Sequence, residues 1–307
     1  MTVTLSDSRL MQLFRHREDR LPILFICLLF ALDLVVFSQV DSIGWLAAWT
    51  ALGLYPKGWI CAWNHHHQHL ATFEASLLNR LLELVFGLHT GMTSHAWTLH
   101  HVLGHHAHYL DQTQDESRWK DLRGHTMGVV RYTFEVAFTA YPRAWAVSRR
   151  YRQHRPAFLG GLLTTGALLA AGLVFRPWQT LFVFLIPMVL SMLVTSWATY
   201  THHAGRPADT HFEASTNILN RTYNALTGNL GYHTAHHYRS GVHWSRLPQL
   251  HEQIKHRIAP DAYLQPGFPF SWGQPIDTGA SSVPSSSSTD SLGPLSRAIA
   301  GSELGGL

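Results

Sequence analysis

The residues best suited to chemistry in this sequence are histidines, and they fall into two groups. Of the 307 residues, 23 are histidine, as many as lysine and arginine together. Eleven histidines lie between His65 and His108, and nine lie between His202 and His256. Neutral imidazole nitrogen is a common ligand of transition metals. The grouping therefore predicts a metal site that two separate parts of the chain build together.

The first group opens with the motif WNHHHQHL. His65 and His69 are four residues apart, so on a continuous helix their imidazoles lie on one face and can reach one metal ion. His66 points elsewhere on such a helix and is an alternative ligand. The motif predicts two metal ligands at the end of an apolar segment.

The second motif of the first group is HHVLGHH. His101 and His105 share one face of a helix and His106 is adjacent, so the motif offers three imidazoles. The overlapping stretch HAWTLHH gives a different register, in which His95 and His100 are alternative ligands. Either register predicts that this segment contributes to a site with room for two metal ions.

The second group contains the motifs TYTHHAG and GYHTAHH. The first offers one ligand, either His203 or the alternative His202. In the second, His233, His236 and His237 follow the spacing i, i+3 and i+4, which is one helical face. This group therefore predicts four further ligands.

The donor set narrows the choice of metal without settling it. Cys27 and Cys61 both lie in apolar stretches, which excludes a disulfide framework and leaves no suitable thiolate. Structural zinc takes four ligands and usually some cysteine. Eight or nine imidazoles instead suit two metal ions with open positions for oxygen chemistry, whereas ligand type alone leaves iron, copper, nickel and zinc open.

The elements that must position these histidines are long apolar segments. Four segments of about 20 residues each match the length of a membrane-spanning helix. They cover roughly residues 21–40, 42–63, 157–175 and 178–199, and both histidine groups begin where a predicted span ends. So much apolar sequence excludes a secreted disulfide scaffold, a disordered chain and a typical nucleic-acid binder, and it predicts an integral protein of the lipid bilayer.

The distribution of arginine predicts the orientation of these spans. Basic residues precede the first and third spans: Arg9, Arg15, Arg17, Arg20, Arg143, Arg149, Arg150, Arg152 and Arg155. Lysine and arginine favour the cytosolic side of membrane proteins. We therefore expect a multi-pass protein with both termini in the cytosol and the metal site facing the cytosol.

These features define the expected fold and domains. The fold class is all-α, with four transmembrane helices in two hairpins and a cytosolic helical cap that holds a di-metal site. A cytosolic segment, residues 1–20, precedes a membrane domain at 21–272, and residues 273–307 form a Ser/Gly-rich tail of disordered composition. Within the cap, Phe73–Leu88 and Met127–Val147 are amphipathic and are expected along the membrane surface.

The order of the four boxes resembles the membrane-bound fatty acid desaturase and alkane hydroxylase superfamily, over roughly residues 21–258. The resemblance implies a non-haem di-iron centre on the cytosolic side of an all-helical protein. Carried over box by box, it implies nine iron ligands: His65, His69, His101, His105, His106, His203, His233, His236 and His237.

The same resemblance implies O2-dependent oxidation of an unactivated C–H bond in a fatty acid or fatty acyl chain, with the two iron ions carrying out the oxidation. No HPGG haem motif is present in the chain. The resemblance therefore implies a separate ferredoxin, rubredoxin or cytochrome as the external electron donor, together with its reductase.

The motifs do not select one reaction within the superfamily. The motifs NHHHQH, GHHAHYLD and GYHTAHH are similar to small relatives that decarboxylate free fatty acids to terminal 1-alkenes. The HxG of His203 and Gly205 resembles alkane hydroxylases, whereas Trp244, Leu247 and Pro248 are similar to the desaturase continuation. Desaturation, decarboxylation and hydroxylation stay open, and a membrane metal transporter is the alternative outside the enzymes.

Several side chains near the boxes are candidates for supporting roles. Carboxylates and amides commonly orient metal-bound imidazoles, and the candidates here are Asp111, Asp115, Asp209 and Asn229. Arg239 and Arg246 follow the last box and are candidates for pairing with a fatty carboxylate or an acyl-carrier phosphate. Asp33 lies inside the first predicted span, where an acidic residue is a functional-site candidate, and the other spans offer it no obvious basic partner.

Overall fold

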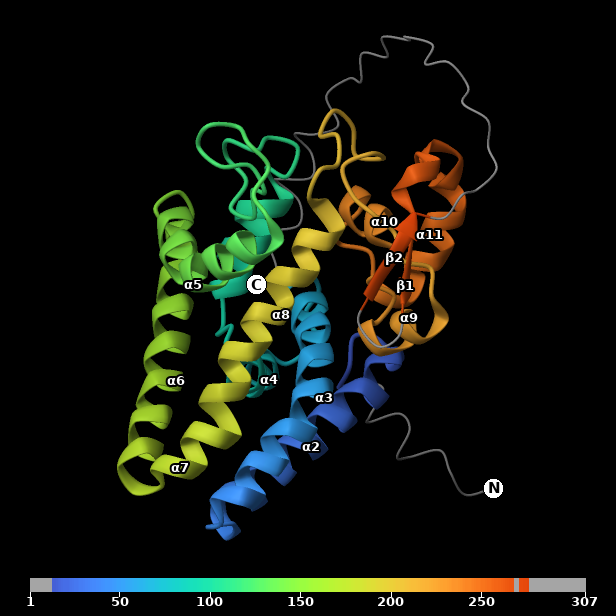
Figure 1. The fold of residues 1–307 in the computed structure, drawn as a ribbon. Coiled ribbons are helices and arrows are strands. Elements are labelled where there is room, and N and C mark those ends of the chain that lie inside the picture. The colour runs from blue at the N-terminus through green and yellow to red at the C-terminus, as the bar shows by residue number, and fades with distance from the viewer. Residues whose placement is uncertain (1–12, 268–270, 276–307) are drawn as a thin grey trace, which may run out of the picture. The chain divides into compact units, whose positions relative to one another are not determined.

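The computed structural model describes residues 13–267 and 271–275 of the chain. Most of the predicted N-terminal segment 1–20, and the predicted tail 273–307 apart from residues 273–275, lie outside the described residues. Within the described part, helices form the architecture (Figure 1). The predicted helical class agrees with this arrangement.

Long helices follow the four apolar segments. The first and third begin and end within a few residues of their predicted spans, the second continues through the first histidine motif, and the fourth span is divided among three consecutive helical segments. They are α2 (Arg20–Gln39), α3 (Ile43–His69), α6 (Arg155–Phe175) and α8 (Ile186–His203), the last preceded by α7 (Pro177–Gln179) and a π-helical segment, η4 (Thr180–Leu185). The continuation of α3 places the histidines beyond the apolar part of the helix.

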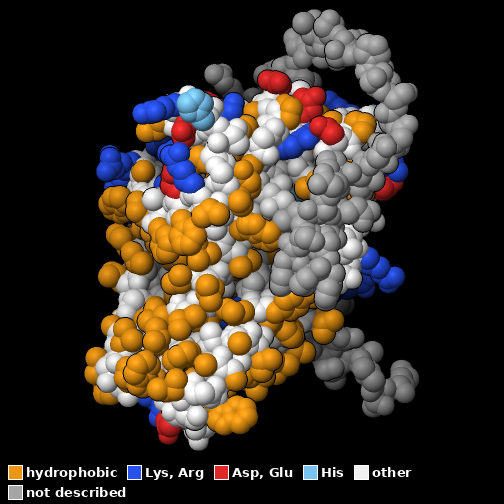
Figure 2. Space-filling model, viewed as in Figure 1, with side chains coloured by type: hydrophobic (Ala, Val, Ile, Leu, Met, Phe, Trp, Pro, Cys, Tyr) orange, Lys and Arg blue, Asp and Glu red, His pale blue; other side chains and the backbone are white. Residues whose placement is uncertain are grey.

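Three of the described helical stretches are long and apolar enough to cross a membrane: Arg17–Gln39, Arg152–Phe175 and Pro177–His203. The second predicted span, α3, is 27 residues long but less apolar than these three. Figure 2 shows hydrophobic side chains spread over the part of the surface formed by the long helices, with most of the basic and acidic side chains near one end. Because a large apolar surface of this kind is unfavourable in water, these helices indicate a membrane protein.

Shorter helices form the remainder. The connection between α3 and α6 contains α4 (Ser76–Thr90), a π-helix, η2 (Thr98–His106), and α5 (Val129–Ser148). After α8 come α9 (Arg221–Thr227), α10 (His233–Tyr238) and α11 (Leu247–Ile254). Two short antiparallel strands that the sequence did not predict, β1 (Leu264–Gly267) and β2 (Ser271–Pro275), end the described chain.

The two predicted amphipathic segments are the helices α4 and α5. In α5, Val130, Phe134 and Phe138 recur every four residues and are exposed, whereas Tyr132 and Val136 on another face are buried. An exposed apolar stripe at this spacing fits a helix that lies in the interface between lipid and water. The position of both helices at a membrane surface remains a prediction.

Asp33 has a basic partner that the sequence analysis did not find. Lys57 of α3 places Nζ 2.8 Å from Asp33 Oδ2, and both side chains are essentially fully buried. The indole nitrogen of Trp49 donates to Asp33 Oδ1 at 2.8 Å, and His89 of α4 lies 3.4 Å from the carboxylate. The expectation that Asp33 lacks a partner was wrong, because helix pairing brings Lys57 to the level of Asp33.

The π-helical segment η4 also bonds to polar side chains of α3. Its wider turn disturbs the regular hydrogen bonds of the backbone and makes carbonyl oxygens available to side chains. Lys57 Nζ donates to Val183 O at 2.8 Å, and Thr50 Oγ1 donates to Phe182 O at 2.6 Å. Polar groups on α3 thus join α2, α4 and η4 in a region that is otherwise apolar.

Candidate metal centre

The nine predicted ligands come from α3, η2, α8 and α10, and the fold brings their side chains together. They form two groups in which the possible ligand atoms of each group all lie within 4.8 Å of one another. Cluster A consists of His65, His69, His101, His106 and His236. Cluster B consists of His105, His203 and His237. The ninth residue, His233, places Nε2 3.0 Å from His203 Nε2 and 3.2 Å from His237 Nε2, so it lies against cluster B.

Cluster A joins three helices through a series of close imidazole contacts. His101 Nε2 lies 2.9 Å from His65 Nε2 and 3.0 Å from His106 Nε2. His236 Nε2 of α10 lies 3.1 Å from His106 Nε2. The nitrogens therefore point toward a common centre, which is the arrangement that a metal ion requires.

The π-helix η2 explains how one motif supplies both clusters. Its hydrogen bonds run from residue i to i+5, so each turn holds more residues than an α-helical turn. Residues i+4 and i+5 consequently lie on either side of residue i. His106 joins His101 in cluster A, whereas His105 points to cluster B. His101 and His105 were predicted to share one α-helical face, but they belong to different clusters.

A carboxylate and a backbone carbonyl orient two of the three ligands of cluster B. His105 Nδ1 lies 2.8 Å from Asp115 Oδ1, and His203 Nδ1 lies 3.0 Å from Ala214 O. If each Nδ1 carries the hydrogen of these bonds, Nε2 has a free lone pair directed into the cluster. Metal-binding histidines are typically held in this way.

The buried state of the imidazoles fits a metal centre. Burial and the neighbouring imidazoles hold the pKa of His101, His106, His236 and His237 well below 6.5, so these rings are neutral at pH 7. Neutral imidazole is the form that binds a metal. Nε2 of His69 and Nε2 of His105 are buried and have no hydrogen-bond partner, which is costly unless another group satisfies them. A donor set of this composition fits two transition-metal ions.

Two of the four alternative ligands have their ring nitrogens engaged beside the clusters. His202 places Nδ1 2.8 Å from Thr216 O and Nε2 3.1 Å from the hydroxyl of Tyr223. His66 places Nε2 3.0 Å from Thr227 O. These contacts favour His203 over His202, and His65 over His66, as ligands.

The other two alternatives belong to the surroundings of the clusters. His95 Nε2 lies 2.8 Å from a guanidinium nitrogen of Arg80, and His95 Nδ1 lies 3.3 Å from His154 Nδ1. His100 is buried in η2 and is absent from both clusters. The geometry therefore favours the register HxxxHH over HAWTLHH for the second motif.

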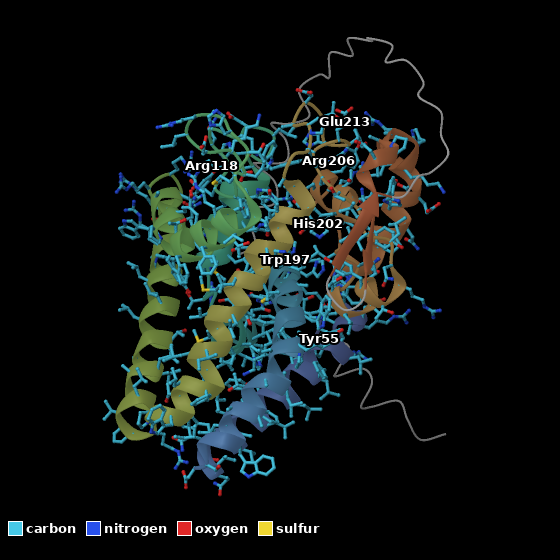
Figure 3. All side chains as sticks on the ribbon, viewed as in Figure 1. Tyr55, Arg118, Trp197, His202, Arg206 and Glu213 are labelled. Carbon is cyan, nitrogen blue, oxygen red and sulfur yellow. The ribbon has the colours of Figure 1, made fainter. Side chains whose placement is uncertain are left out.

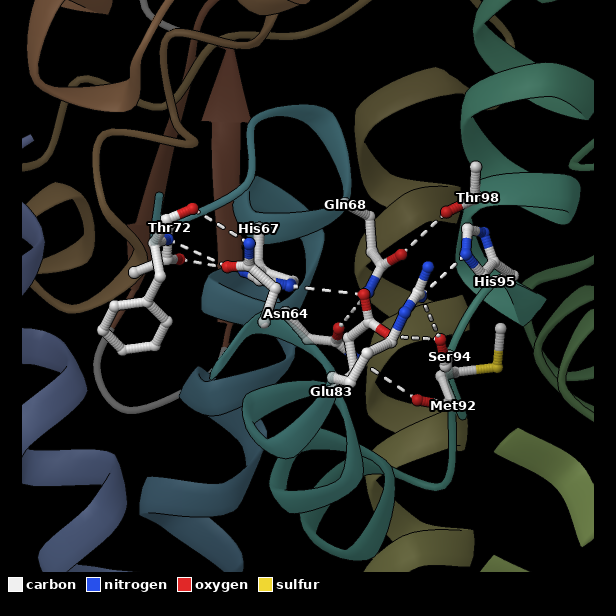
Figure 4. A network of polar contacts seen from close by, with 12 residues as sticks. Asn64, His67, Gln68, Thr72, Glu83, Met92, Ser94, His95 and Thr98 are labelled. Carbon is white, nitrogen blue, oxygen red and sulfur yellow. Dashed lines mark hydrogen bonds and ion pairs between the residues drawn. The ribbon is translucent and has the colours of Figure 1, made fainter. Parts of the chain in front are cut away.

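A polar network holds the end of α3 against α4 and the start of η2 (Figure 4). Gln68 donates to Asn64 at 3.2 Å and accepts from Thr98 at 2.7 Å. Glu83 of α4 bonds Ser94, and its carboxylate lies 2.8 Å from Arg80. This network fixes the helix turn from which cluster A receives two of its histidines.

The electrostatics of Glu83 show how strongly this network favours the charged carboxylate. Burial alone raises the pKa of Glu83, but contacts with His67, Ser94 and Arg80 outweigh burial and lower the pKa to about 2. Glu83 is therefore ionised throughout the neutral pH range, and it offers a permanent acceptor to the residues around α3.

The remaining predicted supporting residues lie apart from the histidines in the described structure. Asp111 accepts hydrogen bonds from Thr113 and Gln114 of its own loop. Asp209 is exposed, and Asn229 donates to Trp244 O at 3.2 Å. Of the four candidates for orienting ligands, Asp115 alone has a hydrogen bond to a proposed ligand among the described contacts.

The two predicted head-group arginines are at the surface. Arg239 is exposed, with its guanidinium over the ring of Tyr238, and Arg246 is also exposed. Neither lines the large cavity described next. Their pairing with a substrate head group remains a prediction.

A cavity of about 490 Å³ reaches both clusters. Apolar and aromatic side chains of α3 and α8 form much of its wall, among them Leu54, Trp59 and Val194. At the other end it is lined by histidines of both clusters, including His101 and His203. Ligand sites are typically concave and mostly apolar with a few polar groups, so this cavity can hold an apolar chain next to the clusters.

Asn217, which no sequence motif indicated, positions α10. Asn217 Oδ1 accepts a hydrogen bond from the backbone nitrogen of Thr234, and Asn217 Nδ2 donates to Thr234 Oγ1 at 2.8 Å. A free N–H at the start of a helix needs such a partner. The nearby Gly231 backbone lies so close to Ile218 O that a Cβ would collide with it. The spacing of residues in the sequence could not have predicted either contact.

We expect Asp115→Asn to lower turnover by about 10- to 100-fold, the range typical for residues that orient a metal ligand. The amide keeps the size of the side chain but weakens the acceptor that fixes the His105 ring. Turnover and bound iron should be measured together. Asp111→Asn is the matched control, because the Asp111 carboxylate accepts its hydrogen bonds from Thr113 and Gln114 of its own loop, and an equal loss in both variants would contradict the role of Asp115.

Comparison with protein-family models places the chain beside known proteins. The family model described as fatty acid desaturase matches residues 43–267, which is well over half of the chain and includes all nine predicted ligands. No curated protein matches the chain.

Proposed function

The chain belongs to the fatty acid desaturase family, and on this basis we propose that it oxidises an unactivated C–H bond of a fatty acid or fatty acyl chain with O2 at a di-iron centre. Family membership makes the protein an oxidoreductase whose substrate is a fatty acyl compound. The finer assignment of the metal and of the reaction rests on the arguments that follow.

The observation that carries the proposal is the meeting of the cavity with both clusters. The cavity has apolar walls contributed by α3 and α8, and it ends at histidines that the proposal assigns as metal ligands. An apolar chain bound there has its C–H bonds next to the proposed oxidising centre, and its burial among apolar side chains supplies binding energy.

We assign the five histidines of cluster A to one iron ion and the three of cluster B, together with His233, to the other. Bound iron supplies the activation of O2 for the abstraction of hydrogen. The residues of the chain keep the imidazoles neutral, hold them in orientation through Asp115 and Ala214 O, and exclude water with an apolar wall. For desaturation, O2, two electrons and two protons join two substrate hydrogens to give two waters, so an external electron donor is required.

The proposed topology has four spans, with α3 as the second span, both termini in the cytosol and the clusters facing the cytosol. The polar pair Arg176 and Asp41, 2.5 Å apart, joins the two short connections that follow α2 and α6. The histidines begin at the opposite ends of α3 and α8. The short connections thus lie at one end of the long helices and the histidines at the other end. This arrangement supports two helical hairpins that both return to the side of the membrane where the histidines lie.

A metal transporter fits the geometry less well. A transporter is expected to hold its ions near the middle of the membrane, between broken helices. Here the proposed ligands on α3 and α8 lie at the last turns of those helices, and the others lie on η2 and α10 beyond the apolar segments. This placement favours the oxidase over transport.

Product analysis tests the proposal. Purified protein receives iron, a ferredoxin reducing system, O2 and a medium-chain fatty acid or its acyl thioester, and mass spectrometry identifies the products. We expect O2-dependent oxidation to an alkene of unchanged chain length. A terminal 1-alkene one carbon shorter would instead assign oxidative decarboxylation of the free acid, and an alcohol would assign hydroxylation. The absence of any O2-dependent product with acids, thioesters or alkanes would contradict the proposed function.

A further inference from the structure

We infer that Tyr109 and His211 form the bridge through which electrons from an external one-electron carrier protein enter the metal centre. This inference rests on the proposed function, because the proposed reduction of O2 is what requires external electrons. It identifies two residues to which neither the sequence motifs nor the family match assigns a role.

Tyr109 lies directly against the clusters. It follows the second histidine motif on the chain, is 5% exposed, and its ring centroid is 4.3 Å from that of His237. The rings of His105, His106 and His203 are all within 6.4 Å of the tyrosine ring by the same measure. Tyr109 therefore packs against proposed ligands of both clusters.

His211 connects this tyrosine to the surface. The tyrosine hydroxyl and His211 Nδ1 are 2.5 Å apart, which is a short hydrogen bond. The His211 side chain is exposed, and it lies in the segment between α8 and α9. The His211 ring, a hydrogen bond, the Tyr109 ring and a ring contact thus lead from solvent to His237.

The position of this segment suits a water-soluble carrier. Figure 3 labels Arg206 and Glu213, which flank His211 in the sequence, at the end of the molecule away from α7 and the lower ends of the long helices. Asp209 and Thr210 beside it are also exposed. A carrier protein can approach His211 from water without entering the apolar region, because the surface there is polar.

Burial of cluster B favours a defined route for electrons, whereas His69 and His106 of cluster A are partly exposed. His105, His203 and His237 of cluster B are each less than 9% exposed, so a bulky carrier cannot touch them. Electron tunnelling weakens steeply with distance and is favoured by bonded atoms and hydrogen bonds over empty space. The hydrogen bond between Tyr109 and His211 joins the two side chains, so an electron does not have to cross empty space between them.

The electron balance is simple. Each transfer removes one electron from the reduced carrier, which is oxidised, and delivers it to the metal centre, which is reduced. Two such transfers supply the two electrons that one O2 requires beyond those of the substrate. Tyr109 and His211 serve as a bridge and are themselves neither oxidised nor reduced, and the phenol keeps its proton.

The test separates electron delivery from chemistry with two variants of the iron-loaded protein. Tyr109→Phe keeps the ring against His237 but removes the hydroxyl, and His211→Leu removes the exposed imidazole. Tyr141→Phe and His125→Leu are the matched controls, because the Tyr141 hydroxyl bonds Gly91 O in another part of the fold and His125 is an exposed loop residue. Bound iron is measured for every variant.

The main readout is the anaerobic rate at which reduced [2Fe–2S] ferredoxin, and in a second series reduced rubredoxin, reduces the protein, followed by stopped-flow absorbance of the carrier. We expect both bridge variants to slow this reduction at least several-fold with unchanged iron, and both controls to match the wild type. Unchanged rates in both bridge variants with both carriers would overturn the inference. If Tyr109→Phe loses iron, the rate at which the carrier reduces His211→Leu alone decides whether the inference holds.

A second measurement distinguishes this inference from the proposed function. Each protein is reduced completely with dithionite and then mixed with O2 and fatty acid for a single turnover. Wild type and bridge variants should form equal amounts of product, because the bridge no longer limits delivery. Loss of product in the bridge variants alone would also overturn the inference, since it would place the two residues in the chemistry. No product from the wild type would contradict the proposed function, while the reduction rates still test the bridge.

Discussion

Replacing His236 with alanine is expected to abolish oxidation of the fatty substrate and to lower bound iron. His236 is the member of cluster A that α10 contributes, and its ring centroid lies 4.6 Å from those of both His65 and His69. Its removal deletes one of five possible ligands and the link between α10 and the other two helices. We expect a loss greater than the roughly 10- to 100-fold typical of residues that only support a ligand.

The measurement combines product formation with iron per chain. His66→Ala is the demanding control, because His66 is next to His65 in the sequence while its Nε2 contacts Thr227 O instead of the cluster. His125→Ala is a second control, which shows the effect of removing an exposed histidine outside the clusters. Equal iron and activity in His236→Ala and wild type would show that cluster A is not a metal site.

The second large effect concerns stability. Lys57→Met is expected to destabilise the protein by about 3–5 kcal/mol, the usual cost of breaking a buried ion pair by removing one partner. Asp33 would keep its carboxylate among apolar side chains with Trp49 and His89 as its remaining neighbours. An uncompensated charge in a membrane-spanning helix is costly. The free energy of unfolding in detergent micelles, from denaturant titration, gives the effect.

The double variant Asp33→Leu, Lys57→Met identifies the cause. Because it removes both charges, it should recover much of the lost free energy of unfolding, as replacement of buried pairs by apolar residues often does. Lys255→Met is the surface control, since Lys255 pairs with Glu252 in an exposed position and such pairs contribute about 0–1 kcal/mol. A double variant no more stable than Lys57→Met would show that the charge pair is not the source of the effect.

The helices could be predicted because each depends on local sequence. Runs of about 20 apolar residues predicted α2, α6 and the combined helical stretch Pro177–His203 to within a few residues, since hydrophobicity over that length has few other structural solutions. The extension of α3 to His69 was harder to predict, because the run of apolar residues ends before the histidines while the helix continues through them. The strands β1 and β2 are too short to leave a clear pattern.

The candidate site was predictable as a set of residues but not as an arrangement. Spacing within each motif indicated all nine histidines that the fold brings together. Spacing could not show that η2 is a π-helix, which sends His105 and His106 to different clusters. It also could not show contacts between distant segments, such as Asn217 with Thr234, Tyr109 with His211, or Lys57 with Asp33, because tertiary packing alone creates them.

The most direct test of the two-cluster account is the amount and state of iron in the purified wild-type protein. Protein produced with ⁵⁷Fe should be analysed by elemental analysis and Mössbauer spectroscopy. Two clusters predict two iron ions per chain, both with the spectrum of non-haem iron bound by nitrogen ligands. A single iron per chain, or none after reconstitution, would contradict the account.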